Sequence, residues 1–400
     1  MDLRSPPTDP SPRALFGLSV DELRALMLEL GQTRFRGTQV AQALYRERVE
    51  SLEDISTLPA DSRERMRSAG YTVGLPVLAQ TAKSIDGTER YLVRLQDGET
   101  VETVWMPDGN GVDPGDASET HVSEARHGAP SPARFRRATI CVSSQVGCAV
   151  NCQFCLTAKL GIRRNLSAGE IAGQVAAVLN RHAVQVGSAK GQGSPERINL
   201  VFMGMGEPFL NYDAFMAAFR LLSGQMGISP ARMTVSTSGI EPAIRRFAME
   251  PVRPNLALSL NASNDAVRSE IMPITRKWNI AALLAALRTI PFGKREYVTF
   301  EYVLLGGIND QPEHAREVLA LLAGIKAKVN LIVWNPGPGI AYHQPTPEDV
   351  AVFHAMLIAG GIPTFTRKPR GRDIYAACGQ LKRTIEDAPE ESLVTIGAAS

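Results

Sequence analysis

Cysteine and histidine are scarce in this chain of 400 residues, which has five of the former and six of the latter. A sparse and odd set of cysteines argues against a secreted disulfide framework, and no secretory segment opens the chain, so we expect a reducing, cytoplasmic compartment. No apolar run approaches the roughly 18 residues of a membrane span, and we expect no membrane insertion.

An excess of one sign of charge is also lacking, because the formal net charge is only +2. This balance does not by itself indicate a nucleic-acid partner. Two basic clusters could contact phosphates or could equally be solvated surface. The clusters are Arg134, Arg136, Arg137 and Arg367, Lys368, Arg370, Arg372.

Three of the five cysteines fall in one short loop, Cys148, Cys152 and Cys155, with the spacing C-x3-C-x2-C. Thiolates are the usual ligands of iron-sulfur clusters, and three ligands on a four-iron cluster leave one iron open for a small molecule. Zinc is the alternative, but it prefers four Cys or His ligands and no histidine lies in this loop. In this loop the chain resembles the radical S-adenosylmethionine (SAM) enzymes, in which SAM chelates the free iron of a [4Fe-4S] cluster.

The first third of the chain divides into four parts. Residues 1–17 predict a disordered lead, because they begin rich in Pro and Ser. Residues 18–72 predict a helical accessory domain, which begins with a capping box at Ser19 and Glu22. A β segment, 73–106, has hairpin signals at Asp86-Gly87 and Asp97-Gly98. Residues 107–136 lack periodicity and predict a flexible insertion.

From residue 137 to 370, short apolar strands alternate with amphipathic helices, which predicts a parallel α/β sheet wound as a barrel or doubly wound fold. The expected strands are 138–143, 198–203, 232–237, 256–260, 297–304 and 329–334. The expected helices are 168–181, 212–225, 240–248, 279–290, 312–324 and 346–359. A C-terminal segment, 371–400, follows.

Polar motifs follow several of these strands, at the edge where barrel enzymes keep their chemistry. Gly206 and Glu207 follow the second strand, Ser236 ends the third, and Ser259 to Asn261 end the fourth. Trp334-Asn335-Pro336 follows the sixth. Each motif alone could be a cap or a turn. Their shared position predicts one site, in which a carboxylate could accept a hydrogen bond from the amino group of SAM.

Ten ordered motifs make the resemblance more specific, to the RlmN/Cfr family of radical SAM methyltransferases. They include FRGTQVAQALY (35–45), VETVWMP (101–107), CVSSQVGCAVNCQFC (141–155), VFMGMGEPFLNY (201–212), EYVLLGGIND (301–310) and RKPRGRDIYAACGQL (367–381). The match covers roughly residues 18–383. It implies a partial (β/α)6-type radical SAM barrel with an N-terminal helical accessory domain and a small β segment.

The resemblance implies methylation of an unactivated adenine carbon. One SAM methylates Cys378, and a second SAM is cleaved at the cluster to a radical that takes hydrogen from the S-methyl group. The resulting thiomethylene radical adds to the adenine and joins RNA covalently to the protein. Release then requires Glu102 as base and Cys141 as the resolving thiol, which forms a disulfide. From spacing alone, Cys141 could be a packed core cysteine and Glu102 a surface carboxylate.

The SAM-binding positions that the resemblance carries over are Gly206, Glu207, Ser236, Ser259, Leu260, Asn261 and Asn335. The chain departs from the family at Asn261, where His is usual, and has insertions at 107–136 and 184–197. The implied partners are 23S rRNA, transfer RNA and an electron donor such as flavodoxin or ferredoxin, with the protein a monomer. Arg36, Arg46 and Arg48 of the helical domain could contact phosphate, or the helices could simply cap the barrel.

RlmN-type methylation of adenine carbon 2 is the leading expectation. A Cfr-type enzyme would instead methylate carbon 8 and protect ribosomes from antibiotics, and no residue decides between the two on physical grounds. A non-catalytic iron-sulfur RNA-binding protein is the alternative from another class. Such a binder has no need of Glu102, Cys141 and Cys378.

Overall fold

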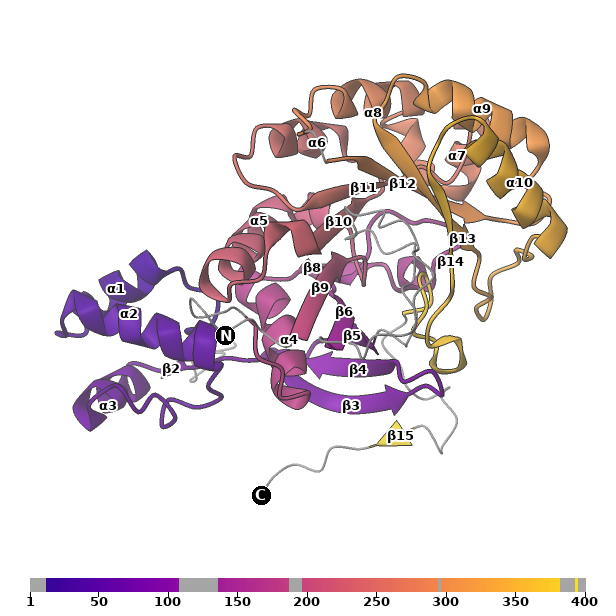
Figure 1. Ribbon diagram of the computed structural model, residues 1–400. Helices are drawn as coiled ribbons and strands as arrows, with labels where there is room; N and C mark the ends of the chain where they lie inside the picture. Colours follow the sequence, from indigo (N-terminus) through magenta and orange to yellow (C-terminus); the bar gives the residue numbers. More distant parts are fainter. Residues whose placement is uncertain (1–11, 108–135, 187–195, 294–295, 382–392, 395–400) are drawn as a thin grey trace, which may run out of the picture.

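A single sheet of eleven strands organises the computed structural model, which describes residues 12–107, 136–186, 196–293, 296–381 and 393–394 (Figure 1). Its strand order is β14-β13-β12-β11-β10-β9-β6-β5-β4-β3-β15. The strands are β3 Val77–Lys83, β4 Glu89–Arg94, β5 Thr100–Pro107, β6 Arg136–Cys141, β9 Glu196–Phe202, β10 Met233–Thr237, β11 Asn255–Ser259, β12 Val298–Leu304, β13 Ala327–Val333, β14 Thr364–Arg367 and β15 Leu393–Val394.

The strands from β6 to β14 pair in parallel, which confirms the predicted barrel-type half of the sheet. Helices lie outside this curved half (Figure 1). They are α4 Ala168–Arg181, α5 Tyr212–Arg220, α6 Glu241–Ala248, α7 Asp265–Ile271, α8 Ile280–Leu287, α9 Pro312–Leu322 and α10 Pro347–Ala359. The barrel is partial, because the outer edge of β6 pairs with β5 and not with β14.

The β segment extends the same sheet with antiparallel strands. Strands β3, β4 and β5 form a meander whose turns fall at the predicted Asp86-Gly87 and Asp97-Gly98 signals. Strand β5 pairs antiparallel with β6, with Val104 opposite Cys141. The β segment is therefore continuous with the barrel and brings β5 beside the strand that precedes the cysteine loop.

The N-terminal unit consists of β1 Arg13–Ala14, α1 Val20–Glu29, α2 Arg34–Gln42, a π-helical turn Ala43–Glu47, α3 Ala60–Ser68 and β2 Tyr71–Thr72. The predicted capping box at Ser19 and Glu22 is present at the start of α1. The predicted lead 1–17 is too long, because β1 pairs with β2 and both Leu15 and Phe16 are buried in the core. Residues 1–11 lie outside the described residues.

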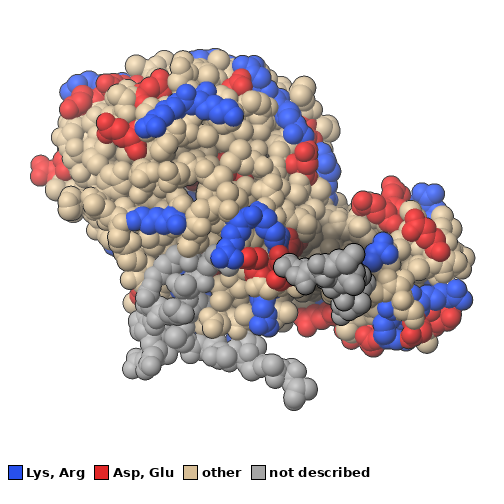
Figure 2. Space-filling model, turned by 180° about the vertical axis from the view of Figure 1, so that it is seen from behind, with Lys and Arg blue, Asp and Glu red and all other residues tan. Residues whose placement is uncertain are grey.

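Two arginines of the N-terminal unit donate hydrogen bonds to the barrel. Arg48 is 4% exposed, and its guanidinium donates to the Asn180 side chain at 2.9 Å and to the Val184 carbonyl at 2.7 Å. Arg46 donates to the Met226 carbonyl at 3.3 Å. The prediction that Arg48 contacts phosphate is therefore wrong, because its guanidinium is buried and donates to groups within the protein. On the face seen in Figure 2, the lobe beside the barrel carries charges of both signs.

Several elements were not predicted from the sequence. They are α7, β14 and the short hairpin of β7 Gln145–Gly147 and β8 Ile162–Asn165. Most of the two predicted insertions, at 108–135 and 187–195, lies outside the described residues. In the part of the chain that the structure describes, no helix has the length and apolar character needed to cross a membrane.

Candidate functional site

The cysteine loop begins directly after β7 and ends at a 3-10 turn, Leu156–Leu160. The amide of Cys148 donates to the carbonyl of Gly161 at 2.8 Å and closes the loop. Gly147 has φ +84°, and a Cβ there would lie 1.8 Å from the same carbonyl oxygen. Only glycine therefore permits this closure.

Cys148, Cys152 and Cys155, the three predicted cluster ligands, line one pocket. Burial raises the pKa of Cys148 to about 12 and also raises the pKa of Cys152 and Cys155. Burial in the protein thus disfavours thiolates here, and a bound cluster of iron ions would offset that effect. Among the described residues, no three His, Cys, Asp or Glu side chains are placed so that they could hold a single metal ion. A four-iron cluster instead takes one thiolate on each of three irons, which fits this loop.

Six of the seven predicted SAM-binding residues line the same pocket: Gly206, Glu207, Ser236, Ser259, Asn261 and Asn335. The pocket holds about 940 Å³ of space, its opening to solvent included, which is within the size range of small-molecule sites. Leu260 is 1% exposed and does not line the pocket. Its carbonyl accepts a hydrogen bond from Arg268 Nε at 2.9 Å.

Glu207 shapes the loop after β9. One of its carboxylate oxygens accepts from the Phe209 amide at 2.9 Å, and the other accepts from the Ser238 amide and hydroxyl, both at 2.7 Å. Burial raises the pKa of Glu207, while these hydrogen bonds oppose the shift. Gly206 adopts φ +96°, and a Cβ there would lie 2.5 Å from the Gln145 side chain. The glycine is thus required by packing against Gln145.

A further carboxylate, that of Glu301 on β12, lies next to Ser236 and Ser259. Ser236 donates to Glu301 Oε2 at 2.9 Å, and the Ser236 and Ser259 hydroxyl oxygens are 3.3 Å apart. Burial raises the pKa of Glu301, and the nearby Arg367 guanidinium opposes that shift. Glu301 lines both pockets of the site. A buried carboxylate bonded to hydroxyl groups is well suited to accept from further hydroxyl groups, such as those of a ribose.

Arg268 holds the ends of β10 and β11 together. Its guanidinium, with no exposed surface, donates to the carbonyls of Leu260, Ser238 and Ser259 and to the Thr275 hydroxyl. These bonds fix the loops that carry the serines.

Asn261 has φ +57°, a conformation that asparagine tolerates better than most residues. Its side chain accepts from the Val303 amide at 2.9 Å and lies 3.2 Å from the Met272 sulfur. The side chain is therefore engaged within the protein.

Asn335 supplies the observation that best fits a bound ligand. Its Nδ2 donates to the carbonyl of Cys378 at 3.3 Å, while its Oδ1 is buried and has no hydrogen-bond partner. A buried acceptor without a partner is costly unless a ligand satisfies it. Asn335 lines both pockets, so this oxygen is available to an N–H of SAM.

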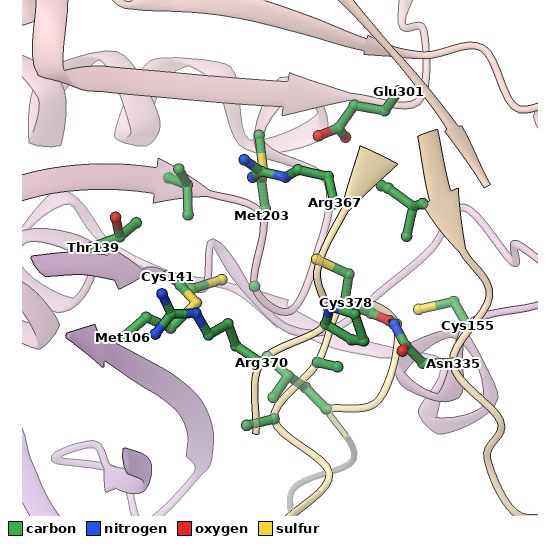
Figure 3. Close-up of a pocket in the computed structure, with 18 of the residues that line it drawn as sticks. Met106, Thr139, Cys141, Cys155, Met203, Glu301, Asn335, Arg367, Arg370 and Cys378 are labelled. Carbon is green, nitrogen blue, oxygen red and sulfur yellow. The ribbon is translucent and has the colours of Figure 1, made fainter. Parts of the chain in front are cut away.

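A second pocket adjoins the first and contains the two remaining cysteines. Cys141, at the end of β6, and Cys378 both line it, together with Met106, Arg367 and Arg370 (Figure 3). Both cysteines are free thiols. Cys378 is exposed, but its surface opens into the pocket, so the protein around it still raises the pKa of its thiol, as burial does for Cys141. The structure thus brings the two predicted reactive thiols to one cavity.

Glu102 lies beside this pocket without lining it. It is buried on β5, and its Oε1 is 3.3 Å from Nη1 of Arg90, which is also fully buried. The Glu102 carbonyl accepts from the Ser143 hydroxyl at 2.6 Å. The view of Glu102 as a solvent-facing carboxylate is therefore wrong, because a buried arginine pairs with it.

Three residues of the site, Glu301, Arg268 and Arg90, were not predicted from the sequence. For Glu301 the signal was present, since a charged residue in the middle of a mostly apolar strand is unusual unless it faces a site. Arg268 and Arg90 gave no comparable signal, because arginines on a short helix and on an antiparallel strand are ordinary surface residues.

Comparisons with known proteins identify the family of this chain. The family model described as "Radical SAM superfamily" matches residues 142–319, and the one described as "Ribosomal RNA large subunit methyltransferase N-terminal domain" matches residues 14–71. A crystal structure of a radical SAM methyltransferase from Sphaerobacter thermophilus superposes with a TM-score of 0.79 at 36% identity. That similarity covers 93% of this chain and 100% of the other. The fold and the cysteine loop thus define a radical SAM enzyme, whose cofactors are a [4Fe-4S] cluster and SAM.

Curated relatives narrow the class. The probable dual-specificity RNA methyltransferase RlmN of Koribacter versatilis is 55% identical over 358 residues, which are 90% of this chain and 98% of the relative. The dual-specificity RNA methyltransferase RlmN of Campylobacter jejuni is 41% identical over 375 residues, 92% of this chain and 99% of the relative. The chain belongs to the RlmN family of radical SAM methyltransferases.

Proposed function

We propose that this enzyme methylates carbon 2 of adenine in 23S rRNA and in transfer RNA, with Cys378 as the carrier of the methyl group. The observation that carries the proposal is the position of Cys378. It lines both the pocket of the cysteine loop and the pocket of Cys141, so one side chain faces both halves of the site. Relatives named dual-specificity RNA methyltransferases support the two RNA substrates.

The chemistry of adenine explains why a carrier is needed. Carbon 2 is a poor nucleophile and cannot attack the methyl group of SAM directly. When bound, the cluster and SAM supply a methyl group and, in a second use, a radical that abstracts hydrogen. Cys378 accepts the methyl group on its sulfur, and the S-methylene group then bonds to the ring carbon. The proposed SAM-binding residues orient SAM toward this sulfur, from strand ends that Arg268 holds rigid.

Release of the RNA uses two further residues of this chain. Addition of the S-methylene radical leaves one unpaired electron on the ring, which the oxidised cluster, when bound, would take back. Glu102 accepts the proton from the ring carbon, and the Cys141 thiolate attacks the Cys378 sulfur. The carbon-sulfur bond breaks as the sulfur-sulfur bond forms, and the electron pair of the broken bond stays with the ring substituent, which a proton completes to a methyl group. The resulting disulfide must then be reduced for the next turnover. Support comes from the common pocket of the two thiols.

We propose carbon 2 rather than carbon 8 because the relatives carry the RlmN name. A flavodoxin or ferredoxin as electron donor, and a cytoplasmic location beside the RNA substrates, belong to the same proposal. A monomer as the active form is part of the same proposal.

Mass spectrometry of nucleosides tests this function. Ribosomal and transfer RNA that lack the modification are incubated without oxygen with cluster-reconstituted protein, SAM and a reductant. We expect 2-methyladenosine in both RNA classes. A product of 8-methyladenosine alone would show the Cfr-type reaction instead. SAM cleavage to 5′-deoxyadenosine without either product would support the radical chemistry and contradict the proposed RNA substrates.

A further inference from the structure

Arg90 is a buried charge that the proposed reaction has not yet used. It lies on β4 with no exposed surface, and its only ion-pair partner given by the geometry is the equally buried Glu102, 3.3 Å away. Its Nε and Nη2 atoms have no hydrogen-bond partner. A buried ion pair is often no more stabilising than an apolar pair of the same volume. Stability alone is therefore a weak reason for this arginine.

The same guanidinium contacts the segment that leads to Cys378. Arg90 Nη1 donates to the carbonyl of Tyr375 at 3.3 Å. Tyr375 has φ +53°, a conformation that a residue other than glycine keeps only when its surroundings enforce it. Cys378 follows three residues later.

The β3–β4 hairpin, which carries Arg90, holds this segment at two further points. The Ser84 hydroxyl donates to Asp373 Oδ1 at 2.6 Å, and Asp86 Oδ2 accepts from the Gly371 amide at 2.9 Å. A Cβ at Gly371 would lie 2.9 Å from the Thr88 side chain, so the two segments are in close contact. The hairpin thus determines where the segment before Cys378 lies.

Strand register puts Arg90 and Glu102 on the face of the sheet that carries Cys141. Arg90 is opposite Val104 on β5, and Val104 is opposite Cys141 on β6. Residues directly opposite in a sheet share a face, and Glu102 shares the face of Val104 because it is two residues away. Met106, two residues beyond Val104, lines the pocket of both thiols.

We propose that Arg90 is a positioning residue, which holds the carboxylate of Glu102 in a fixed relation to the segment carrying Cys378. The proposal rests on the proposed function, in which Glu102 takes the ring proton. Without the guanidinium, the buried carboxylate loses the cation that lies 3.3 Å from its Oε1, so its charged form and its fixed orientation both become less favourable. The carrier would still be methylated, but the RNA joined to it would not be released.

The test compares Arg90→Met, Arg90→Lys and a matched control, Arg94→Met, at the exposed end of the same strand. Cluster-loaded full-length protein is given SAM, a reductant and unmodified RNA. Four quantities are measured: methylation of Cys378, formation of 5′-deoxyadenosine, the covalent RNA–protein adduct on a denaturing gel, and methylated adenosine. For Arg90→Met we expect the first two to match the wild type and the adduct to accumulate. Its release should slow at least about 100-fold, the lower range of what a positioned base contributes.

Arg90→Lys keeps the charge and should recover part of the release rate, and Arg94→Met should match the wild type. A second comparison covers the case in which Arg90→Met folds poorly. Because Arg90 acts through Glu102, adding Arg90→Met to Glu102→Gln should slow release no further than Glu102→Gln alone. A further loss in the double variant, or wild-type release in Arg90→Met, would overturn the proposal. If the wild type itself forms no methylated adenosine, the proposed function has failed instead.

Discussion

Replacing Arg268 by methionine should destabilise the protein and loosen its SAM pocket together. The guanidinium donates to three backbone carbonyls, those of Leu260, Ser238 and Ser259, at the ends of two neighbouring strands. Burial lowers the pKa of Arg268 to about 10, so the group still carries its charge at neutral pH. Methionine fills much of the same volume but donates to none of these oxygens.

The magnitude follows from the carbonyls left behind. Each buried acceptor without a partner costs ~1–3 kcal/mol, and the lower figure applied to all three gives a loss of ~3 kcal/mol in the free energy of unfolding. Removing one member of a buried polar network by mutation costs up to ~5 kcal/mol. We therefore expect a loss of ~3–5 kcal/mol.

Urea unfolding of the cluster-free protein measures this loss, with Arg276→Met as the matched control. Arg276 is exposed and lies in the 3-10 turn just after α7, so its replacement should change stability by less than ~0.5 kcal/mol. Equilibrium binding of SAM to the cluster-loaded variants gives the second readout, and Arg268→Met should bind more weakly than the control. A loss below ~1 kcal/mol with unchanged SAM affinity would refute the assigned network.

Three further changes have defined outcomes. Cys378→Ala should abolish RNA methylation while the cluster absorbance and SAM binding persist, and methylated RNA from this variant would contradict a carrier role. Cys141→Ala should leave RNA covalently attached to the protein on a denaturing gel, whereas normal release would assign the resolving role elsewhere. Burial raises the pKa of Glu301 in the folded protein above its ordinary value of 4.5. The contribution of Glu301 to stability is therefore complete below pH 4.5 and is lost as the pH rises through the pKa of the folded protein. Glu301→Gln should therefore lose less stability than the wild type between acidic pH and pH 8 in urea titrations, and equal losses would argue against a buried, ionising Glu301.

The fold was predictable where apolar and polar residues follow the period of a strand or a helix. Apolar runs such as Leu200–Phe202 and Leu256–Leu258 are buried on both faces, and runs of this kind mark strands of a covered parallel sheet. Strand β14 was missed because Thr364–Arg367 is short and follows a Gly-Gly-Ile-Pro sequence that indicates a turn. Leu15 and Phe16 were assigned to the disordered lead because two apolar residues after a Pro-rich stretch show no period.

The site was predictable where chemistry restricts the residue type, and less so where packing does. The spacing of Cys148, Cys152 and Cys155 and the strand-end positions of Ser236 and Asn335 come together in the structure as expected. The Arg90–Glu102 pair joins two strands, and the bonds of Arg268 run to backbone carbonyls that a sequence does not display. Such partners depend on strand register and loop geometry.

A labelled single turnover tests the central claim, that Cys378 carries the methyl group to adenine. The protein is first methylated with SAM bearing an isotopically labelled methyl group, excess SAM is removed, and the label is mapped to Cys378 by peptide mass spectrometry. Unlabelled SAM, a reductant and unmodified RNA are then added without oxygen. The account predicts that the first 2-methyladenosine formed carries the label. Unlabelled product, with the label still on the protein, would contradict it.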